Sequence, residues 1–267
     1  MDLQLKGKAA IVTGGNRGIG KAVARELASE GVNVALVARD KAALQAAAAE
    51  IARISNSIKV LQFSADTGDD AAVRKMVAEV AAAFGRIDIL VNCAAQAGGQ
   101  SKPPALTEIT NEHFWADMNI KVMGYLRTTR EVAPHMIKQK SGRIINVSGL
   151  AARSTGTIIG SMRNVSVAAL TKNIADELSP HGIQAVCVHP GLTRTEKTPG
   201  VIAAQAKAQG VSEAEIEKRM AGRNLTRKVI TAEEIAHVVT FLASPKAIAI
   251  NGDAIAAGGG APGAIYY

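Results

Sequence analysis

The chain has 267 residues, of which 48% are hydrophobic, so it can bury a large core, and no apolar run approaches the roughly 18–20 residues of a membrane span. Its 31 basic and 23 acidic residues give a net charge of +8, and the basic residues are spread along the chain. With aromatic residues at 3%, this pattern argues against a base-stacking nucleic-acid surface and favours a phosphorylated cofactor or an acidic substrate as the anionic partner.

The first predicted element is a buried strand, Ala9–Val12, and a glycine-rich turn follows it directly. The turn reads Thr13-Gly14-Gly15-Asn16-Arg17-Gly18-Ile19-Gly20 and leads into a predicted helix over Gly18–Ser29. Gly14 allows the tight turn, Gly18 lets backbone N–H groups approach phosphate oxygens, and Gly20 lets the helix pack closely on the strand. A chain that passes on glycines from a strand into a helix predicts a cradle for a pyrophosphate group.

Short β-branched runs then alternate with longer alanine-rich amphipathic stretches. The other predicted strands are Val34–Val37, Lys59–Phe63, Ile87–Val91, Arg143–Val147, Ile183–Val188 and a weaker one at Ala254–Ala257. The other predicted helices are Lys41–Ile54, Ala71–Phe84, Asn111–Lys138, Val165–Leu178 and Ala232–Leu242. This alternation predicts an α/β fold over 1–267, a single doubly wound, Rossmann-like parallel sheet with helices on both faces.

One segment interrupts the alternation after the sixth predicted strand. Residues 193–229 are polar and prone to form helices. An insertion at the carboxyl end of a strand in such a sheet overhangs the ligand crevice. We therefore expect this segment to be a substrate lid within the one domain.

Further motifs follow the later predicted strands in a fixed order. They are Asp66-Thr67, Asn92-Cys93-Ala94-Ala95, Asn119, Ile145-Asn146-Val147-Ser148 and Pro190-Gly191-Leu192-Thr193-Arg194-Thr195. Together with the glycine turn, they make the chain resemble the short-chain dehydrogenase/reductase family over essentially its whole length. The motif at Asn92 departs from the Asn-Asn-Ala-Gly that is usual in the family.

The resemblance implies roles for these residues. Asp66 would contact an adenine, Asn92 would brace neighbouring strands, and Ala94 would pass close to the adenosine ribose. Residues of the last motif would hold the carboxamide end of a nicotinamide. Asp66 could instead cap a helix, and Pro190 and Gly191 could serve only as a turn. The residues predicted to bind the cofactor are Gly14, Asn16, Arg17, Gly18, Ile19, Gly20, Arg39, Asp66, Thr67, Asn92, Ala94, Pro190, Gly191, Thr193 and Thr195.

The end of the second predicted strand indicates which dinucleotide is bound. A carboxylate at this tip would accept hydrogen bonds from a ribose 2′-hydroxyl and repel a 2′-phosphate. Here the tip is Ala38, followed by Arg39, and the glycine turn supplies a second guanidinium in Arg17. Two planar cations suit a phosphate dianion. We expect NADP(H) rather than NAD(H), with Asp40 capping the next helix.

The catalytic half of the family signature is missing. In the family a Tyr, followed four residues later by a Lys, stands about a dozen residues after the Ser. The only tyrosines here are Tyr125, Tyr266 and Tyr267, and none has a Lys four residues on. Counting back from the following helix places Gly160 and Asn164 at the two positions, and a register shifted by three places Arg163 and Val167 there.

The remaining candidates for catalysis are therefore Ser148, Asn119 and Asn164. Gly160 transfers no proton, and its small size is expected to open space for a bulkier ligand. Lys121 is two residues after Asn119, a spacing at which side chains point to different faces of a helix. Arg163 stays protonated, and His189 is expected to pack against the end of its strand.

Three functions fit these observations. The favoured one is an NADP(H)-dependent oxidoreductase that acts on a carbonyl or alcohol group of a small molecule through a non-standard site. The alternatives are a lyase or hydrolase that keeps or recycles the dinucleotide, and a non-catalytic nucleotide-binding subunit.

Further expectations concern the surroundings of the protein. The family resemblance implies a homo-oligomer, a tetramer or a dimer, joined through the helices over Asn111–Lys138 and Val165–Leu178 and through the C-terminal strand. Cys93 and Cys187 lie in or beside apolar strand-like segments, which indicates buried thiols and a reducing compartment. The N-terminal segment has no signal-peptide layout. We expect a cytoplasmic protein with no metal site.

Overall fold

Seven parallel strands form the central sheet of the computed structural model, which describes residues 1–96, 103–263 and 265. The strand order is β3-β2-β1-β4-β5-β6-β9. The bounds of the strands are β1 Ala9–Thr13, β2 Asn33–Ala38, β3 Val60–Ser64, β4 Ile89–Asn92, β5 Gly142–Val147, β6 Ile183–Pro190 and β9 Ala254–Ala257. The predicted doubly wound sheet is confirmed, and the weakest predicted strand forms over the predicted residues.

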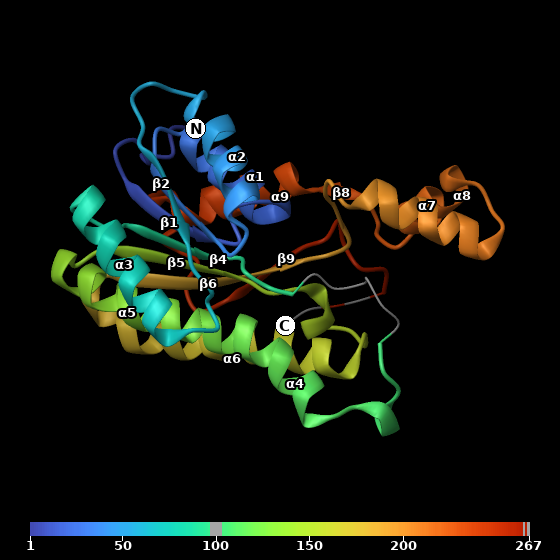
Figure 1. Ribbon diagram of the computed structural model, residues 1–267. Coiled ribbons are helices and arrows are strands. Elements are labelled where there is room, and N and C mark those ends of the chain that lie inside the picture. The colour runs from blue at the N-terminus through green and yellow to red at the C-terminus, as the bar shows by residue number, and fades with distance from the viewer. Residues whose placement is uncertain (97–102, 264, 266–267) are drawn as a thin grey trace.

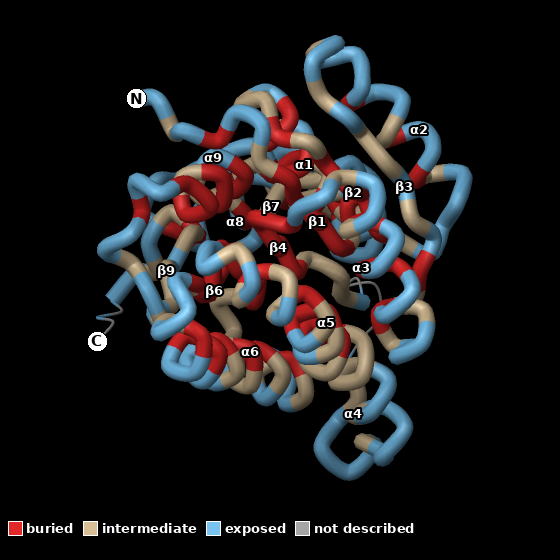
Figure 2. Tube along the Cα trace, turned by 90° about the vertical axis from the view of Figure 1, so that its left-hand side faces the viewer, coloured by how far each residue is buried: buried red, intermediate tan, exposed pale blue. Residues whose placement is uncertain are grey.

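Helices cover both faces of the sheet (Figures 1 and 2). One face carries α1 (Gly18–Ser29), α2 (Lys41–Ala52) and α9 (Ala232–Ala243), whose apolar side chains share a core with one side of the strands. The other carries α3 (Asp70–Phe84), α5 (Gly124–Gln139) and α6 (Ile158–Leu178), with a second core. Because both faces are buried, the central strands are mostly apolar and do not alternate between apolar and polar residues.

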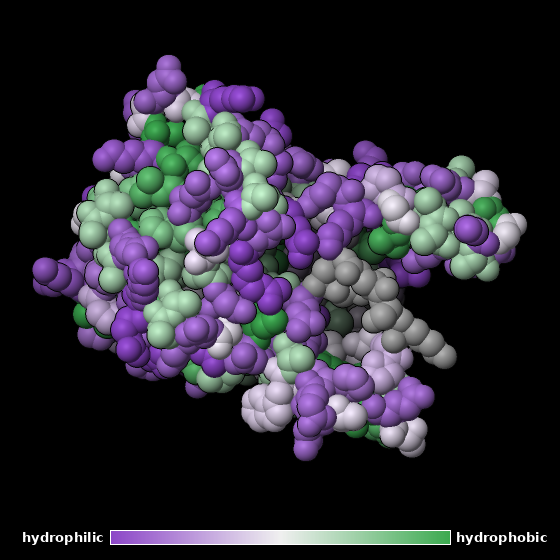
Figure 3. All heavy atoms as spheres, viewed as in Figure 1, coloured by the Kyte–Doolittle hydropathy of each residue, from purple (hydrophilic) through white to green (hydrophobic). Residues whose placement is uncertain are grey.

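The insertion after β6 forms a separate arm. A short parallel pair, β7 (Thr193–Arg194) with β8 (Ile230–Thr231), closes its base. Between them, α7 (Thr198–Gln209) and α8 (Glu213–Ala221) pack on each other through a small core of Ile202, Ala206, Ile216 and Met220. The arm projects from the body of the molecule (Figures 1 and 3).

Two helices differ from the prediction. The single helix expected over Asn111–Lys138 is divided into α4 (Asn111–Met118), a π-helical turn (Asn119–Met123) and α5. Helix α6 begins at Ile158 rather than Val165, because the Thr157 hydroxyl accepts a hydrogen bond from the Gly160 N–H and caps it. Short 3₁₀ turns occupy Leu106–Glu108, Leu150–Ala152, Ser179–His181 and Pro245–Ala247.

The described residues contain neither a membrane-spanning helix nor a cluster of metal-binding side chains. None of their helices is both long enough and apolar enough to cross a membrane. Within the same residues, no three His, Cys, Asp or Glu side chains gather in a way that could hold a metal ion.

Candidate active site

A pocket of about 810 Å³ lies at the carboxyl ends of the parallel strands, and the arm supplies part of its wall. Most of the residues that the sequence singled out line it. They are Gly14, Asn16, Arg17, Gly18, Ile19, Gly20, Arg39, Asp66, Thr67, Ala94, Ser148, Asn164, Pro190, Gly191, Thr193 and Thr195. The pocket is large enough for an extended small molecule. Asn92 and Asn119 are the two predicted site residues that do not line it.

The glycine turn has the close contacts that its sequence predicts. Gly14 adopts φ +68°, and a Cβ there would lie 3.0 Å from the carbonyl oxygen of Cys93. A Cβ on Gly20 would lie 2.3 Å from the carbonyl oxygen of Gly14, so only glycine allows α1 to approach the turn this closely. These contacts bring the first turn of α1 against the pocket.

An anion occupies the N-terminus of α1. The Gly18 N–H donates to both carboxylate oxygens of Glu196, at 3.0 and 3.1 Å. Glu196 comes from the arm, so this carboxylate is a local stand-in for a negatively charged ligand. Free N–H groups and the helix dipole favour an anion at this point. The residues present therefore fit a dinucleotide pyrophosphate, which would compete with Glu196 for the Gly18 N–H.

The end of β2 presents a cation to the pocket. The Arg39 guanidinium is 61% exposed and lies 3.7 Å from a carboxylate oxygen of Asp66. Asp40 accepts from the Ala43 N–H at 3.0 Å and caps α2, as the sequence predicts. Asp66 instead accepts from the Gly68 N–H, and Asp69 is the cap of α3. Asp66 is thus not the cap of α3, and its remaining surface faces the pocket.

Asn92 is fully buried behind the pocket rather than in its wall. Its amide donates to the Asn146 side chain at 2.9 Å, and its oxygen accepts from the Thr128 hydroxyl at 2.7 Å. These bonds join β4 to β5 and to α5. The expectation that Asn92 braces neighbouring elements is therefore met, whereas its place among the cofactor-binding residues is corrected.

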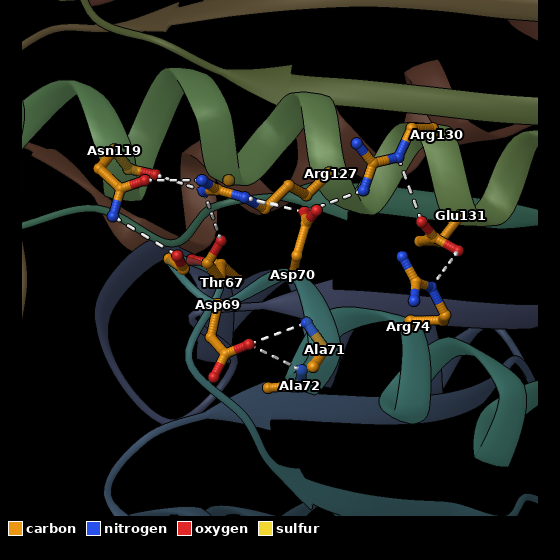
Figure 4. A network of polar contacts seen from close by, with 12 residues as sticks. Thr67, Asp69, Asp70, Ala71, Ala72, Arg74, Asn119, Arg127, Arg130 and Glu131 are labelled. Carbon is orange, nitrogen blue, oxygen red and sulfur yellow. Dashed lines mark hydrogen bonds and ion pairs between the residues drawn. The ribbon is translucent and has the colours of Figure 1, made fainter.

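Asn119 points away from the pocket, which corrects its assignment as a catalytic residue. Its side-chain oxygen accepts from Arg127 at 2.8 Å, and Arg127 also pairs with Asp70 at 3.1 Å. Figure 4 shows Asn119 within this polar network between α5 and the start of α3. Asn119 is also the first residue of the π-helical turn Asn119–Met123, which separates α4 from α5.

Lys121 occupies the place expected for Asn119. It is 5% exposed and lines the pocket. Its Nζ donates to the Ser148 carbonyl oxygen at 2.9 Å and to Asn164 Oδ1 at 3.3 Å. Asn119 and Lys121 do point in different directions, as their spacing predicts, but Lys121 rather than Asn119 is the one that faces the pocket. One signal was available in the sequence, since Lys121 is the single charged residue in the stretch Asn119–Leu126.

The surroundings of Lys121 disfavour its charge. Burial, and to a smaller extent the Arg163 guanidinium, lower the pKa of the Lys121 amine to about 7. Arg163 lies on α6, and its Nη1 donates to both oxygens of Asp117 at 2.6 and 2.7 Å. The amine is therefore able to exchange its proton near neutral pH, which an ordinary lysine does not do.

Neither Gly160 nor Tyr125 supplies a tyrosine acid or the space for one. Gly160 does not line the pocket, and a Cβ there would lie 2.5 Å from the Thr157 hydroxyl that caps α6. The expected opening at this position is therefore filled. Tyr125 is buried, and its hydroxyl donates to the Val147 carbonyl oxygen at 2.9 Å. Tyr266 and Tyr267 lie outside the described residues.

Ser148 and Asn164 meet beside Lys121. The Ser148 hydroxyl donates to the Asn164 carbonyl oxygen at 2.9 Å, with Asn164 Oδ1 at 3.3 Å. Both residues are buried and line the pocket. His189, on β6, does not line it, and burial lowers its pKa to about 4. The site therefore combines a hydroxyl, an amide and a buried amine at one end of the pocket, with the glycine turn at the other.

Comparisons with known proteins match most of the chain. A family model described as short chain dehydrogenase matches residues 8–206. The short-chain reductase protein NovJ of Streptomyces niveus is 32% identical over 254 residues, which cover 95% of this chain and 93% of that protein. The 3-oxoacyl-(acyl-carrier-protein) reductase FabG of Staphylococcus epidermidis is 32% identical over 265 residues, which cover 95% of this chain and 98% of that protein. L-Sorbose reductase from Gluconobacter frateurii, solved with NADPH and L-sorbose, has a TM-score of 0.90 at 27% identity. The match covers 99% of this chain and 100% of that one.

Because its pKa is lowered in the folded protein, Lys121 should make the free energy of unfolding depend on pH. The unfolded lysine titrates near 10.5 and the folded one near 7, so between these values the unfolded chain binds more protons and stability rises with pH. Replacing Lys121 by Met removes this effect. From the pKa difference, the free energy of unfolding of wild type should rise by on the order of 2 kcal/mol between pH 7 and pH 9, relative to that of Lys121→Met.

Urea denaturation at several pH values measures the difference. Lys172→Met, a change at an exposed lysine of α6, is the matched control and should run parallel to wild type. If the free energies of unfolding of wild type and Lys121→Met differ by the same amount from pH 6 to pH 9, the buried amine does not titrate in this range.

Proposed function

The chain belongs to the short-chain dehydrogenase family of NAD(P)-dependent oxidoreductases, and on that premise we propose that it uses NADP(H) to interconvert a carbonyl and an alcohol group on a small molecule. One observation carries the proposal: a single pocket joins the glycine turn of α1 to the cluster of Ser148, Asn164 and Lys121. We further propose that this cluster works without a tyrosine acid.

The choice of NADP(H) rests on charge at the adenosine end of the pocket. Ala38 ends β2 where a carboxylate would select NAD(H), and Arg39 follows it. Arg17, at the start of α1, lines the same pocket. Two guanidinium groups suit a 2′-phosphate. The solved L-sorbose reductase, which covers 99% of this chain, is described as a complex with NADPH.

At the other end, Pro190, Gly191, Thr193 and Thr195 would hold the nicotinamide carboxamide. A bound reduced nicotinamide supplies a hydride to a carbonyl carbon. Ser148 would donate its hydroxyl to the carbonyl oxygen, where negative charge develops, after turning from the Asn164 carbonyl oxygen that it now contacts. Asn164 would position this hydroxyl and the Lys121 amine through its side-chain oxygen.

We also propose that residues 193–229 form a substrate lid within a single domain. The lid would cover the pocket through Glu196, Lys197, Met220 and Arg223, all of which line it. Its two helices pack mainly on each other, so the arm has its own small core.

A homo-oligomer, a tetramer or a dimer, completes the proposal. Large apolar side chains are exposed on α4, α5 and α6, namely Trp115, Leu126, Met162 and Val165. Exposed apolar residues on neighbouring helices are typical of a subunit interface.

Turnover with Ser148→Ala tests the function. We expect wild type to consume NADPH in proportion to alcohol formed from at least one of L-sorbose, an acetoacetyl thioester and a cyclic diketone. Ser148→Ala should lower kcat by roughly 10²-fold or more, as expected for the loss of a donor to developing charge. Ser55→Ala, in the exposed turn after α2, should match wild type. Absence of NADPH consumption with every ketone contradicts the proposed function.

Cofactor preference tests the role of Arg39. Fluorescence titration should give tighter binding of NADPH than of NADH, and Arg39→Asp should weaken NADPH binding by roughly 10-fold to 100-fold, as for a lost hydrogen bond between charged groups. Arg53→Asp makes the same change at the exposed end of α2 and should not alter the preference. Equal affinities of the unmodified protein for NADPH and NADH would refute this assignment.

Light scattering tests the assembly. We expect a mass of two or four times the 27.7 kDa of one chain. The double change Met162→Glu with Val165→Glu places two charges on the exposed side of α6 and should reduce the mass toward one chain, because burying unpaired charge is unfavourable. A wild-type mass near 27.7 kDa rules the proposal out.

A further inference from the structure

The Lys121 amine is positioned to reach a ligand as well as its two protein acceptors. An ammonium has three N–H bonds. The Ser148 carbonyl oxygen and Asn164 Oδ1 take two of them. Because Lys121 lines the pocket, the third can point to a molecule bound there. These two hydrogen bonds also hold the amine near the Ser148 hydroxyl, because that hydroxyl donates to the Asn164 carbonyl oxygen.

We propose that Lys121 is the catalytic residue that gives a proton to the substrate oxygen during reduction and takes it back during oxidation. The inference rests on the proposed function. In the reductive direction the carbonyl carbon gains a hydride from the bound reduced nicotinamide, and the carbonyl oxygen takes a proton from the Lys121 ammonium. The products are the alcohol, the oxidised nicotinamide and a neutral Lys121 amine. The amine then regains a proton from solvent.

Other groups near Ser148 are less suited to this step. Arg163 is held by Asp117 through two short contacts, and a guanidinium does not release its proton. Tyr125 does not line the pocket, and its hydroxyl donates to the Val147 carbonyl oxygen. Cys93 lines the pocket, but burial raises its pKa to about 12. Among the described residues that line this end of the pocket, Lys121 is the group that can exchange a proton near neutral pH.

Charged and titratable groups surround the amine on several elements. Arg163 faces it from α6 and Asp117 from α4, and these two neutralise each other as an ion pair. Cys93 follows β4, while Cys187 and His189 lie on β6. Burial raises the pKa of Cys187 to about 11 and lowers that of His189 to about 4, so both are neutral around pH 7. The proton that changes near pH 7 in this group is therefore the one on Lys121.

The test is a pH profile on the full chain with NADPH and the ketones named above. In wild type, kcat/KM for reduction should fall tenfold per pH unit above about pH 7, because the donor is the ammonium. The oxidation of the corresponding alcohol should fall below that pH instead. Lys121→Met should lower kcat/KM for reduction by roughly 10²-fold to 10⁴-fold and remove the inflection. Its dissociation constant for NADPH should not change.

Two further variants separate proton transfer from positioning. Lys121→Arg keeps the positive charge and the hydrogen-bond donors, but a guanidinium does not release its proton. Its kcat/KM should therefore stay low, and its pH profile should lack the inflection. Lys121→Cys alkylated with 2-bromoethylamine restores an amine of lower basicity, so activity should return with the inflection at lower pH. Wild type treated with the same reagent controls for Cys93 and Cys187. Lys172→Met controls for the loss of a lysine.

The outcomes distinguish this inference from the function on which it rests. If wild type reduces no ketone with NADPH, both are overturned. If wild type is active but Lys121→Met keeps the same rate or the same inflection, or if Lys121→Arg restores the wild-type profile, the function stands and Lys121 is not the proton donor. The free energies of unfolding of wild type and Lys121→Met at pH 7 and pH 9 provide a test that needs no cofactor. If the difference between the two proteins does not change with pH, the inference is also overturned.

Discussion

The parallel pairing of β1 with β2 on one side and β4 on the other determines where the site lies. Val12 pairs with Leu36 of β2 and with Val91 of β4, so all three strands end at the same edge. The sheet order changes direction at this point, and the loops that leave β1 and β4 enclose a crevice. A Cβ on Gly14 would lie 3.0 Å from the carbonyl oxygen of Cys93 across this crevice. The glycine turn after β1 and the loop after β4 are therefore positioned by one set of backbone hydrogen bonds.

Much of this arrangement could be predicted from the sequence, because it depends on local patterns. The strand-like runs and the glycine turn fix the order of elements, and the residues just after the strands must share one edge. Most of the predicted ligand residues line one pocket for that reason. Asp40 could be identified as the cap of α2 because capping depends on the next three residues.

The errors concern side-chain directions, which depend on departures from regular geometry. The π-helical turn over Asn119–Met123 leaves no clear pattern in the sequence, and within it Lys121 rather than Asn119 faces the pocket. Gly160 was expected to leave a space, but helix α6 starts earlier than predicted and its cap, Thr157, fills that volume. The family resemblance placed Asn92, which ends β4, among the residues that bind the cofactor, although its amide donates to Asn146 on the neighbouring strand β5.

Lys121 and Asn164 are physically linked, because the Asn164 side chain accepts from the Lys121 amine at 3.3 Å. In one of the two registers that the family resemblance allows, position 164 is the one at which the family has its lysine. A lysine there would bring two ammonium groups together, and their repulsion at about 4 Å costs about 4 kcal/mol for an effective dielectric near 20. An asparagine removes that repulsion and supplies an acceptor in its place. The absence of a lysine at 164 is therefore compatible with an amine in this site, because the amine comes from another helix.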